Sequence, residues 1–271
     1  MKQNEKYLIF AHYHKDGLLR KDIVNFLNKS KDIFTKIIFV STKIKNNELN
    51  KLPKNTKSIR RKNIGYDFYS YKIGFNHFLK ISNKNFINKD LFFINSSILF
   101  VAPEKILKIV KKIKINDNEF YGISRSLELA DHIQSYFFFF SSKLFENKKI
   151  LKWWLNIKPI NIHYKVILKY ELGLSKLMKN NKIKLRSIYT KNINLKANNL
   201  LSKIIQRFHE IIYKTPKYYK KDPTNYFWED FYNFYGLVKI RLIKDNNKKY
   251  NLDKLIKLLK KTNIYKLALN N

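Results

Sequence analysis

Short runs of apolar residues alternate with segments of helical periodicity over the first two thirds of this chain. The runs that predict buried strands cover residues 7–11, 36–42, 91–95, 120–124, 135–140 and 183–189. Apolar residues at helical spacing predict helices over residues 18–27, 67–79, 103–112, 143–155 and 163–179. Strands that alternate with helices predict an α/β fold around a central, mostly parallel sheet.

The pattern changes in the last part of the chain, which is helix-rich with polar linkers. We therefore expect an α/β domain over residues 1–198 and a helical C-terminal extension over residues 199–271. Residues 251–261 form an amphipathic, basic helical pattern. Such a helix can lie on an anionic membrane surface, or pack on the domain with its Lys face in water. The sequence leaves both readings open.

Charge adds a second observation, because 56 Lys and Arg residues against 20 acids give a formal net charge of +36. A field of this sign attracts nucleic acid, anionic lipid or phosphorylated substrates. The chain is also rich in Lys, Asn and Ile and poor in Gly and Pro, as an AT-rich genome would produce, so basicity alone names no partner. It has no Cys, which excludes disulfides and thiolate metal sites. No signal-peptide or membrane-spanning pattern is found, so we expect a cytoplasmic protein, free or peripheral on the inner face of the plasma membrane.

The strongest candidate for ligand binding is the turn that precedes the helix predicted at residues 67–79. Gly65 permits a close backbone approach, Asn63 and Asp67 can bind a base or ribose, and Arg61 can pair with phosphate oxygens. The alternative is a purely structural turn in which Asp67 caps the helix.

Polar residues follow the predicted strands at the edge where parallel sheets bind nucleotides. We expect the following residues to join the turn in binding a donor molecule: His12, Ser41, Thr42, Asn95, Ser96 and Ser97.

Several segments, in this order along the chain, resemble the rhamnan synthesis protein F family of bacterial glycosyltransferases. They include Ala11-His12-Tyr13, Arg61-Lys62-Asn63-Ile64-Gly65-Tyr66-Asp67, Ile94-Asn95-Ser96-Ser97, His132-Ile133-Gln134-Ser135, Tyr170-Glu171-Leu172-Gly173-Leu174-Ser175 and Asp222-Pro223-Thr224-Asn225. The resemblance implies a GT-A-like nucleotide-binding sandwich that transfers rhamnose or a related sugar onto a bacterial surface polysaccharide. The chain departs from the family pattern at Ser96, where members often have Asp, and at Ala102, where they tend to have Gly.

The resemblance also implies candidate catalytic residues. An acid three positions before a Leu serves as general base in family-2 enzymes, and Glu171 with Leu174 matches that spacing. Asp131 and His132 are the rival pair, just before the Phe-rich strand. Gln134 and Ser135 would bind acceptor hydroxyls. The structural alternative for Glu171 is an ordinary helical Glu that pairs with a nearby Lys.

Cofactor use is not fixed by the sequence. Many GT-A enzymes bind Mg²⁺ or Mn²⁺ through an Asp-x-Asp motif, but the matching slot here reads Asn95-Ser96-Ser97. Hard divalent cations need carboxylate oxygens, which disfavours a metal at this slot, and we assign no metal ligand.

Together these features favour an inverting glycosyltransferase of the cell envelope. The expected donor is a nucleotide deoxyhexose such as dTDP-rhamnose, and the expected acceptor is a lipid-linked or lipopolysaccharide-type glycan. An anionic membrane surface is a further candidate partner, whereas nucleic acid is not expected. The alternatives are a transferase of another hexose in the same pathway, or a basic nucleic-acid- or membrane-binding protein without catalysis.

Overall fold

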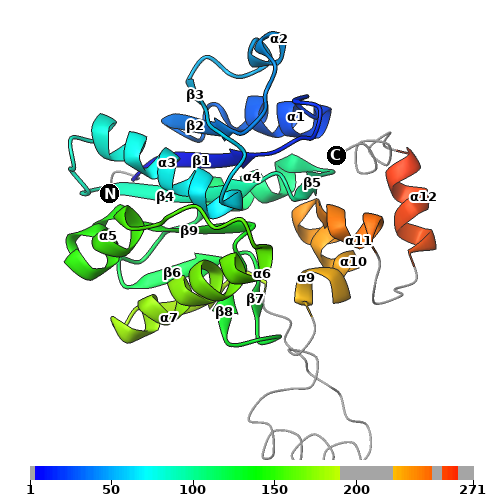
Figure 1. Ribbon diagram of the computed structural model, residues 1–271. Coiled ribbons are helices and arrows are strands. Elements are labelled where there is room, and N and C mark those ends of the chain that lie inside the picture. The colour runs from blue at the N-terminus through cyan, green and yellow to red at the C-terminus, as the bar shows by residue number, and fades with distance from the viewer. Residues whose placement is uncertain (1–3, 190–221, 246–251, 262–271) are drawn as a thin grey trace, which may run out of the picture.

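A computed structural model describes residues 4–189, 222–245 and 252–261 of the protein (Figure 1). Its centre is a seven-stranded sheet in the order β10-β6-β9-β4-β1-β2-β3. The strands are β1 (Glu5–His12), β2 (Lys36–Ser41), β3 (Thr56–Arg60), β4 (Lys89–Asn95), β6 (Glu119–Gly122), β9 (Phe137–Ser141) and β10 (Lys184–Ser187). Only β9 runs antiparallel to its neighbours β4 and β6. The predicted α/β class with a mostly parallel sheet is confirmed.

Helices cover both faces of this sheet because side chains alternate along each strand. On β1, Ile9 faces a core shared with α3 (Tyr66–Ile81), α5 (Lys148–Leu155) and α7 (Leu172–Asn180). The next residue, Phe10, faces a second core with α1 (Lys21–Ser30) and α4 (Pro103–Lys112). The Phe-rich strand β9 is buried on both faces, as its unbroken apolar run predicts.

Two local predictions need correction. No helix or strand was predicted over residues 43–57, but they contain α2 (Asn46–Leu49) and the start of β3. Strand β3 lies at the sheet edge and is only half-buried, so it has no apolar run to reveal it. The helix expected over residues 163–179 is divided into α6 (His163–Val166), a π-helical turn η2 (Ile167–Glu171) and α7. Similarly, a 3-10 turn η1 (Ser142–Glu146) precedes α5.

Two small two-stranded sheets flank the main one. Strand β7 (Arg125–Ser126) pairs with β8 (His132–Ile133), and β5 (Ile98–Phe100) pairs with β11 (Leu237–Lys239). The β5–β11 pair joins the C-terminal part to the α/β domain. The other C-terminal elements are α9 (Pro223–Tyr226), α10 (Trp228–Asp230), the π-helical turn η4 (Phe231–Tyr235), α11 (Ile240–Lys244) and α12 (Asp253–Lys261).

Helix α12 is the amphipathic basic segment of the sequence, and its apolar face is covered by protein. Leu255 and Leu259 are fully buried in a small core with Trp228 and Val238. The reading in which this helix packs on the protein is therefore the one that the structure supports. The expected domain boundary at residues 198/199 lies outside the described residues. No helix within the described ranges has the length and apolar character needed to cross a bilayer.

The close contact between α3 and the sheet gives a stability prediction. A Cβ added at Gly74 would lie 2.4 Å from Ile9 Cγ2, inside the packed core. We expect Gly74→Ala to lower the free energy of unfolding by about 1–3 kcal/mol through overpacking. Gly173→Ala is the matched control, because its Cβ meets only the Leu168 carbonyl at 3.9 Å. Urea denaturation of both variants is the measurement, and equal stabilities would contradict the tight fit at Gly74.

Candidate functional site

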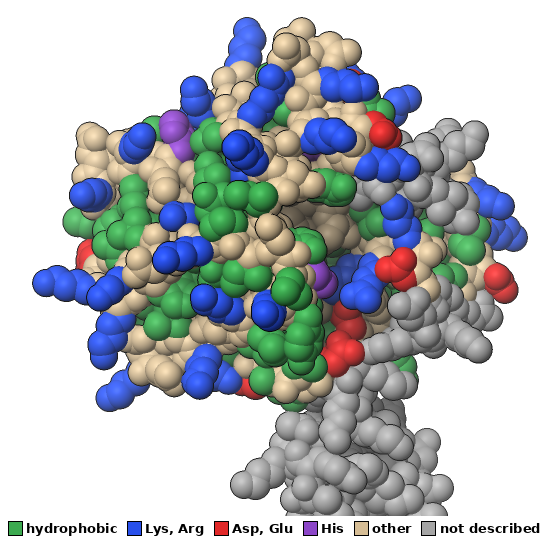
Figure 2. Space-filling model, in the orientation of Figure 1, with side chains coloured by type: hydrophobic (Ala, Val, Ile, Leu, Met, Phe, Trp, Pro, Cys, Tyr) green, Lys and Arg blue, Asp and Glu red, His purple; other side chains and the backbone are tan. Residues whose placement is uncertain are grey.

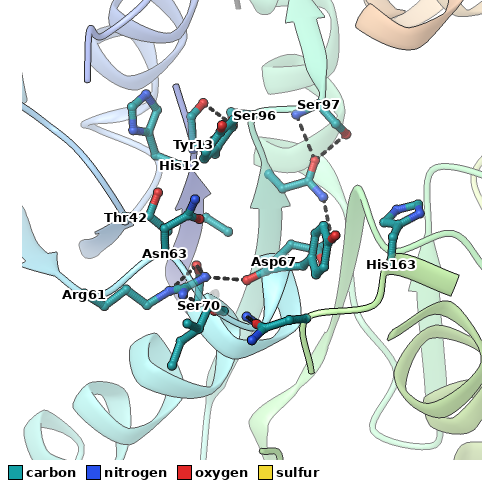
Figure 3. A pocket seen from close by; sticks show the side chains of 16 residues that line it. His12, Tyr13, Thr42, Arg61, Asn63, Asp67, Ser70, Ser96, Ser97 and His163 are labelled. Atoms are coloured by element: carbon teal, nitrogen blue, oxygen red, sulfur yellow. Dashed lines mark hydrogen bonds between the residues drawn. The ribbon is translucent and has the colours of Figure 1, made fainter. Parts of the chain in front are cut away.

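A cleft of about 560 Å³ opens at the carboxyl ends of β1, β2 and β4 (Figure 3). It is lined by Ala11, His12, Tyr13, Thr42, Arg61, Asn63, Ile64, Gly65, Tyr66, Asp67, Ser70, Asn95, Ser96, Ser97, Asn161 and His163. The structure thus brings together every residue expected to bind the donor except Ser41, which lies beneath the lining. Strand ends and the turn before α3 meet here because parallel strands direct their carboxyl ends to one edge.

Two buried polar atoms at the tips of β1 and β2 have no hydrogen-bond partner among the described residues. They are His12 Nε2 and Thr42 Oγ1. The Ser41 hydroxyl lies 2.9 Å from His12 Nδ1 and so fixes the orientation of the ring. Burial, together with the charge of Arg20, lowers the pKa of His12 to about 3, so the imidazole is neutral at physiological pH. The His12 ring packs against Phe39, with ring centroids 5.1 Å apart. Unpaired buried polar atoms cost free energy, so Thr42 Oγ1, on a residue that lines the cleft, is available to a ligand.

The turn before α3, residues 61–67, is held together by Arg61. The guanidinium uses all five N–H donors within the turn and the start of the helix: Nε and Nη2 bind Ser70 Oγ at 2.9 and 2.7 Å, and the other donors reach the carbonyls of Lys62, Ile64 and Tyr66. Burial lowers the pKa of Arg61 to about 10, which leaves it charged at neutral pH. Arg61 therefore has no free N–H group for the expected phosphate contact in this conformation. Its hydrogen bonds stabilise the turn instead.

Gly65 is required by the geometry of this turn. Its φ of +74° lies in the left-handed region, and an added Cβ would lie 2.7 Å from Pro159 Cα. Its N–H donates to Asn161 Oδ1 at 3.1 Å, which joins the turn to the loop after α5. Asn63 is exposed at the cleft and has no hydrogen-bond partner within the described residues, so its amide is available to a ligand.

Asp67 is not the helix cap that the structural alternative required. Helix α3 begins at Tyr66 with Gly65 as N-cap, and no side chain caps it. Asp67 Oδ1 accepts from the Phe68 N–H within the first turn at 2.9 Å, and Oδ2 accepts a hydrogen bond of 2.8 Å from Asn95 Nδ2. Burial raises the pKa of Asp67 to about 6, with a smaller contribution from the nearby Glu171 carboxylate. The side chain therefore contacts β4 and lines the cleft.

The polar residues after β4 form the floor of the cleft. Asn95 Oδ1 accepts from the Ser97 backbone at 3.0 Å and from its hydroxyl at 2.5 Å. Ser96 Oγ accepts from the Tyr13 N–H at 3.0 Å and donates to the Tyr13 carbonyl at 3.2 Å. The Ser96 side chain thus links the end of β4 to the end of β1 through the Tyr13 backbone. Asp67 is the one carboxylate among the lining residues, and no cluster of three metal-ligating side chains occurs within the described ranges.

A buried ion pair that the sequence analysis did not identify fixes this floor from below. Arg20 binds Asp22 through two contacts of 2.9 Å and donates to the carbonyls of Ser96 at 2.8 Å and Ile98 at 2.5 Å. Asp22 also accepts from the Phe100 N–H at 3.0 Å. The only sequence signal was an Arg and an Asp two positions apart at the start of an amphipathic helix.

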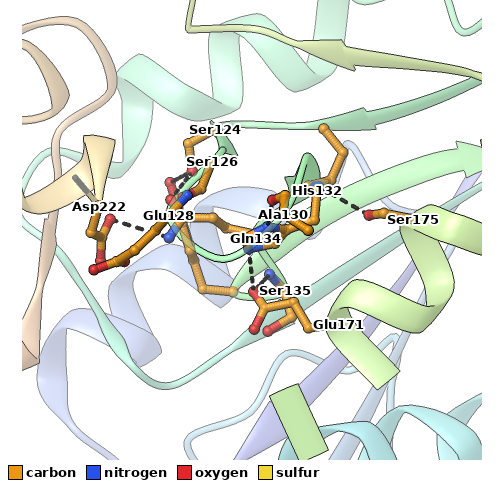
Figure 4. Close-up of polar contacts among 12 residues, drawn as sticks. Ser124, Ser126, Glu128, Ala130, His132, Gln134, Ser135, Glu171, Ser175 and Asp222 are labelled. Atoms are coloured by element: carbon orange, nitrogen blue, oxygen red, sulfur yellow. Dashed lines mark hydrogen bonds and ion pairs between the residues drawn. The ribbon is translucent and has the colours of Figure 1, made fainter. Parts of the chain in front are cut away.

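The expected catalytic and acceptor residues form a second group, none of which lines the cleft (Figure 4). Glu171 ends the π-helical turn η2, and its Oε1 accepts from the Ser135 N–H at 2.7 Å. His132 Nε2 lies 3.9 Å from the same oxygen, while its Nδ1 lies 2.7 Å from the Ala130 carbonyl. Glu171 does not line the cleft, but its carboxylate is close enough to influence Asp67. The predicted base thus lies outside the cleft lining, near enough to the Asp67 carboxylate to raise the pKa of Asp67.

Asp131 and Gln134 are committed elsewhere in this structure. Burial alone would raise the pKa of Asp131, but two hydrogen bonds from Arg125, of 2.5 and 2.8 Å, keep it below its usual value. Lys179 forms a further ion pair with Asp131 at 3.3 Å. Gln134 is buried, and its amide binds Thr224 at 2.7 Å and Asp222 at 3.1 Å. Gln134 thus joins the C-terminal part to the domain, and Asp131 is a bound anion that is poorly suited to accept a proton.

The fold and the cleft define the class of this protein as an α/β protein with a polar ligand cleft at the carboxyl edge of its sheet. The family model for rhamnan synthesis protein F matches residues 37–221. The chain therefore belongs to the rhamnan synthesis protein F family, and the resemblance seen in its sequence segments is confirmed.

Individual relatives are more distant. The "Uncharacterized protein y4gN" of Sinorhizobium fredii is 29% identical over 143 residues, which are 51% of this chain and 36% of the relative. The glycosyltransferase GlyE of Streptococcus pneumoniae has a TM-score of 0.44 and 11% identity, with 99% of this chain and 63% of that one covered. The 4-diphosphocytidyl-2C-methyl-D-erythritol synthase of Anaerococcus prevotii has a TM-score of 0.40 and 13% identity, with 74% and 94% covered. The chain thus spans about a third of the curated relative's length and less than two thirds of GlyE.

The buried ion pair gives a second stability prediction. Arg20→Ala leaves the Asp22 carboxylate buried without its partner, so we expect unfolding free energy to fall by about 3–5 kcal/mol. Lys29→Ala breaks an exposed pair with Glu104, whose side chains are 47% and 58% exposed, and should change stability by less than about 1 kcal/mol. Chemical denaturation compares the two. A similar small effect for both would show that the buried pair does not hold the cleft floor.

Proposed function

We propose that this protein is a glycosyltransferase that moves a deoxyhexose, with rhamnose as the first candidate, from a nucleotide-sugar donor to a bacterial glycan. The observation that carries the proposal is the cleft at the sheet edge, which His12 and Thr42 line beside the turn at residues 61–67, and where Thr42 Oγ1 has no hydrogen-bond partner within the described residues. Membership of the rhamnan synthesis protein F family supports the transferase class and polysaccharide synthesis.

In this proposal the donor lies across the strand tips. His12 Nε2 and Thr42 Oγ1 bind the base, since both are buried and polar and can distinguish donor and acceptor groups. Asn63 binds the ribose or the diphosphate from the turn, and the charge of Arg61 behind it stabilises the leaving phosphate electrostatically. The sugar then lies toward Asp67 and Asn95 at the end of β4.

The proposed reaction is a direct displacement with inversion. An acceptor hydroxyl attacks the anomeric carbon, the bond to the diphosphate oxygen breaks, and a carboxylate takes the hydroxyl proton. Glu171 is the proposed base, and its place at the end of a π-helical turn supports this role, because such turns often occur at functional sites. Asp67 is proposed to bind the donor sugar and position it for this reaction.

The two carboxylates can be separated by kinetics. We expect Glu171→Gln to lower kcat by about 100-fold or more while donor binding stays unchanged, because only the proton acceptor is lost. Asp67→Asn should instead weaken donor binding. Isothermal titration with the nucleotide sugar and steady-state turnover measure the two effects. The reverse pattern would assign the base to Asp67.

The raised pKa of Asp67 adds a pH dependence. Its carboxylate is ionised above about pH 6 and neutral below it, so donor affinity should decrease as pH falls through this value. Asp67→Asn should remove that part of the pH profile. A wild-type affinity that stays constant between pH 5 and pH 7 would contradict the proposed contact of Asp67 with the donor.

Metal dependence gives a separate test. Since the slot of an Asp-x-Asp motif holds Asn95, Ser96 and Ser97, we propose that turnover continues in EDTA. Loss of activity on chelation, with recovery in Mg²⁺ or Mn²⁺, would show that Asp67 or another acid holds an ion.

The first experiment is a thermal-shift comparison of dTDP-, UDP- and GDP-sugars, since a ligand that binds only the native state raises the melting temperature. His12→Ala with Thr42→Val should abolish the shift if the base lies at the strand tips. A shift from none of these donors would reject the proposed function.

A further inference from the structure

The outer surface of residues 147–170 is strongly basic. Between Glu146 and Glu171 the chain contains no acidic residue. Six exposed lysines lie in this stretch, at Lys148, Lys149, Lys152, Lys158, Lys165 and Lys169. None of them forms an ion pair with another residue of the described part of the chain. Residues 147–170 therefore carry an excess of positive charge.

Large apolar side chains are exposed among these lysines. Leu155, Ile162, Tyr164 and Leu168 are 43%, 53%, 57% and 42% exposed. We call the surface formed by these four residues and the six lysines the α5–α6 face. Figure 2 shows hydrophobic and basic side chains intermixed over the region where α5 and α6 lie in Figure 1. Apolar groups ringed by one sign of charge are typical of an interaction surface.

The elements that carry the α5–α6 face pack against one another and against the core. Trp153 on α5 packs edge-on against Tyr170 on η2, with ring centroids 5.9 Å apart. The Tyr170 hydroxyl accepts from the Lys158 N–H at 2.9 Å and donates to its carbonyl at 2.7 Å, which ties down the connecting loop. Trp154 and Val166 anchor the two helices in the core beneath. The exposed apolar side chains therefore stand on a rigid base.

This face adjoins the cleft. Asn161 and His163 line the cleft from the same segment that carries Ile162 and Tyr164 outward. The Tyr66 ring lies 5.3 Å from the His163 ring and is itself 43% exposed at the cleft mouth. Whatever covers the α5–α6 face is consequently held next to the opening of the cleft.

We propose that the α5–α6 face docks on an anionic phospholipid bilayer. The lysines contact headgroup phosphates, while Leu155, Ile162, Tyr164 and Leu168 enter the interfacial layer, which is the combination that binds peripheral proteins to membranes. A nucleic acid would use the lysines but has no place for three exposed aliphatic side chains. A second copy of the chain is disfavoured because each copy carries a net charge of +36. Helix α12 cannot serve, because its apolar face is already buried.

This docking deepens the proposed function and rests on it in one respect. If the acceptor glycan is lipid-linked, a bilayer on the α5–α6 face presents that acceptor at the mouth of the cleft. The acceptor phosphate and the lipid headgroups would then share the same field of lysines. Binding to the bilayer itself requires only the face, so the two parts can be tested separately.

The test is co-sedimentation of the full chain with vesicles of phosphatidylcholine, with and without phosphatidylglycerol. We expect binding only to the vesicles that contain phosphatidylglycerol. Ile162→Ser with Leu168→Ser, and Lys165→Gln with Lys169→Gln, should each weaken it roughly tenfold, because both the apolar and the charged contribution are needed. The control is Lys257→Gln with Lys261→Gln on α12, which removes the same charge from exposed positions elsewhere and should change binding less than about twofold.

Several results would overturn the docking. The first is that the α5–α6 variants bind vesicles as tightly as the wild type, and the second is that the α12 control loses as much vesicle binding as they do. The third is that only the lysine variant loses binding and duplex DNA of random sequence competes with the vesicles. The last result would indicate non-specific polyanion binding. Thermal shift with the nucleotide sugar, measured on the same variants, should be unchanged. A chain that binds vesicles but no donor would leave the docking intact and reject the proposed function, whereas the opposite result would reject the docking alone.

Discussion

The buried pair of Arg20 and Asp22 is the constraint on which the cleft depends. Two charges removed from water are expensive unless their remaining hydrogen-bonding groups are satisfied, and here backbone groups of Ser96, Ile98 and Phe100 complete the set. The pair therefore fixes the path of the chain from the end of β4 into β5. Because Asn95 and Ser97 lie on that path, the floor of the cleft is rigid before any ligand arrives.

Polar groups around the cleft divide into those that build it and those left for a ligand. Arg61 satisfies the carbonyls of the turn and Ser96 satisfies the backbone of Tyr13, so neither is free to bind a ligand in this state. His12, Thr42 and Asn63 remain with available atoms. This separation explains how a chain with so many cations can have a ligand site whose free groups are mostly neutral. The surrounding lysines would then attract an anionic donor or membrane at longer range.

The C-terminal part completes the molecule through a buried polar network as well as through apolar packing. Asp222 accepts from Gln134 at 3.1 Å and from Lys239 at 2.9 Å, and Thr224 donates to Gln134. Each member is satisfied by another, which is the condition under which buried polar groups specify a unique arrangement. The residue expected to contact an acceptor thus serves to hold the returning chain against the domain.

The sequence by itself determined most strands of the sheet and most of its helices, because the spacing of apolar residues reflects which side chains are buried. It also determined the turn at residues 61–67, because Gly65 allows a backbone conformation that other residues rarely adopt. It could not reveal the edge strand β3, which buries too little, or the partners of Arg20 and Gln134, which lie 76 and 88 residues away. It also could not choose between two basic segments with exposed lysines. Leu255 on α12 is buried by Trp228 and its neighbours, while Ile162 beside α6 is exposed. Only the tertiary structure decided this, since which apolar face is covered depends on residues far away in the chain.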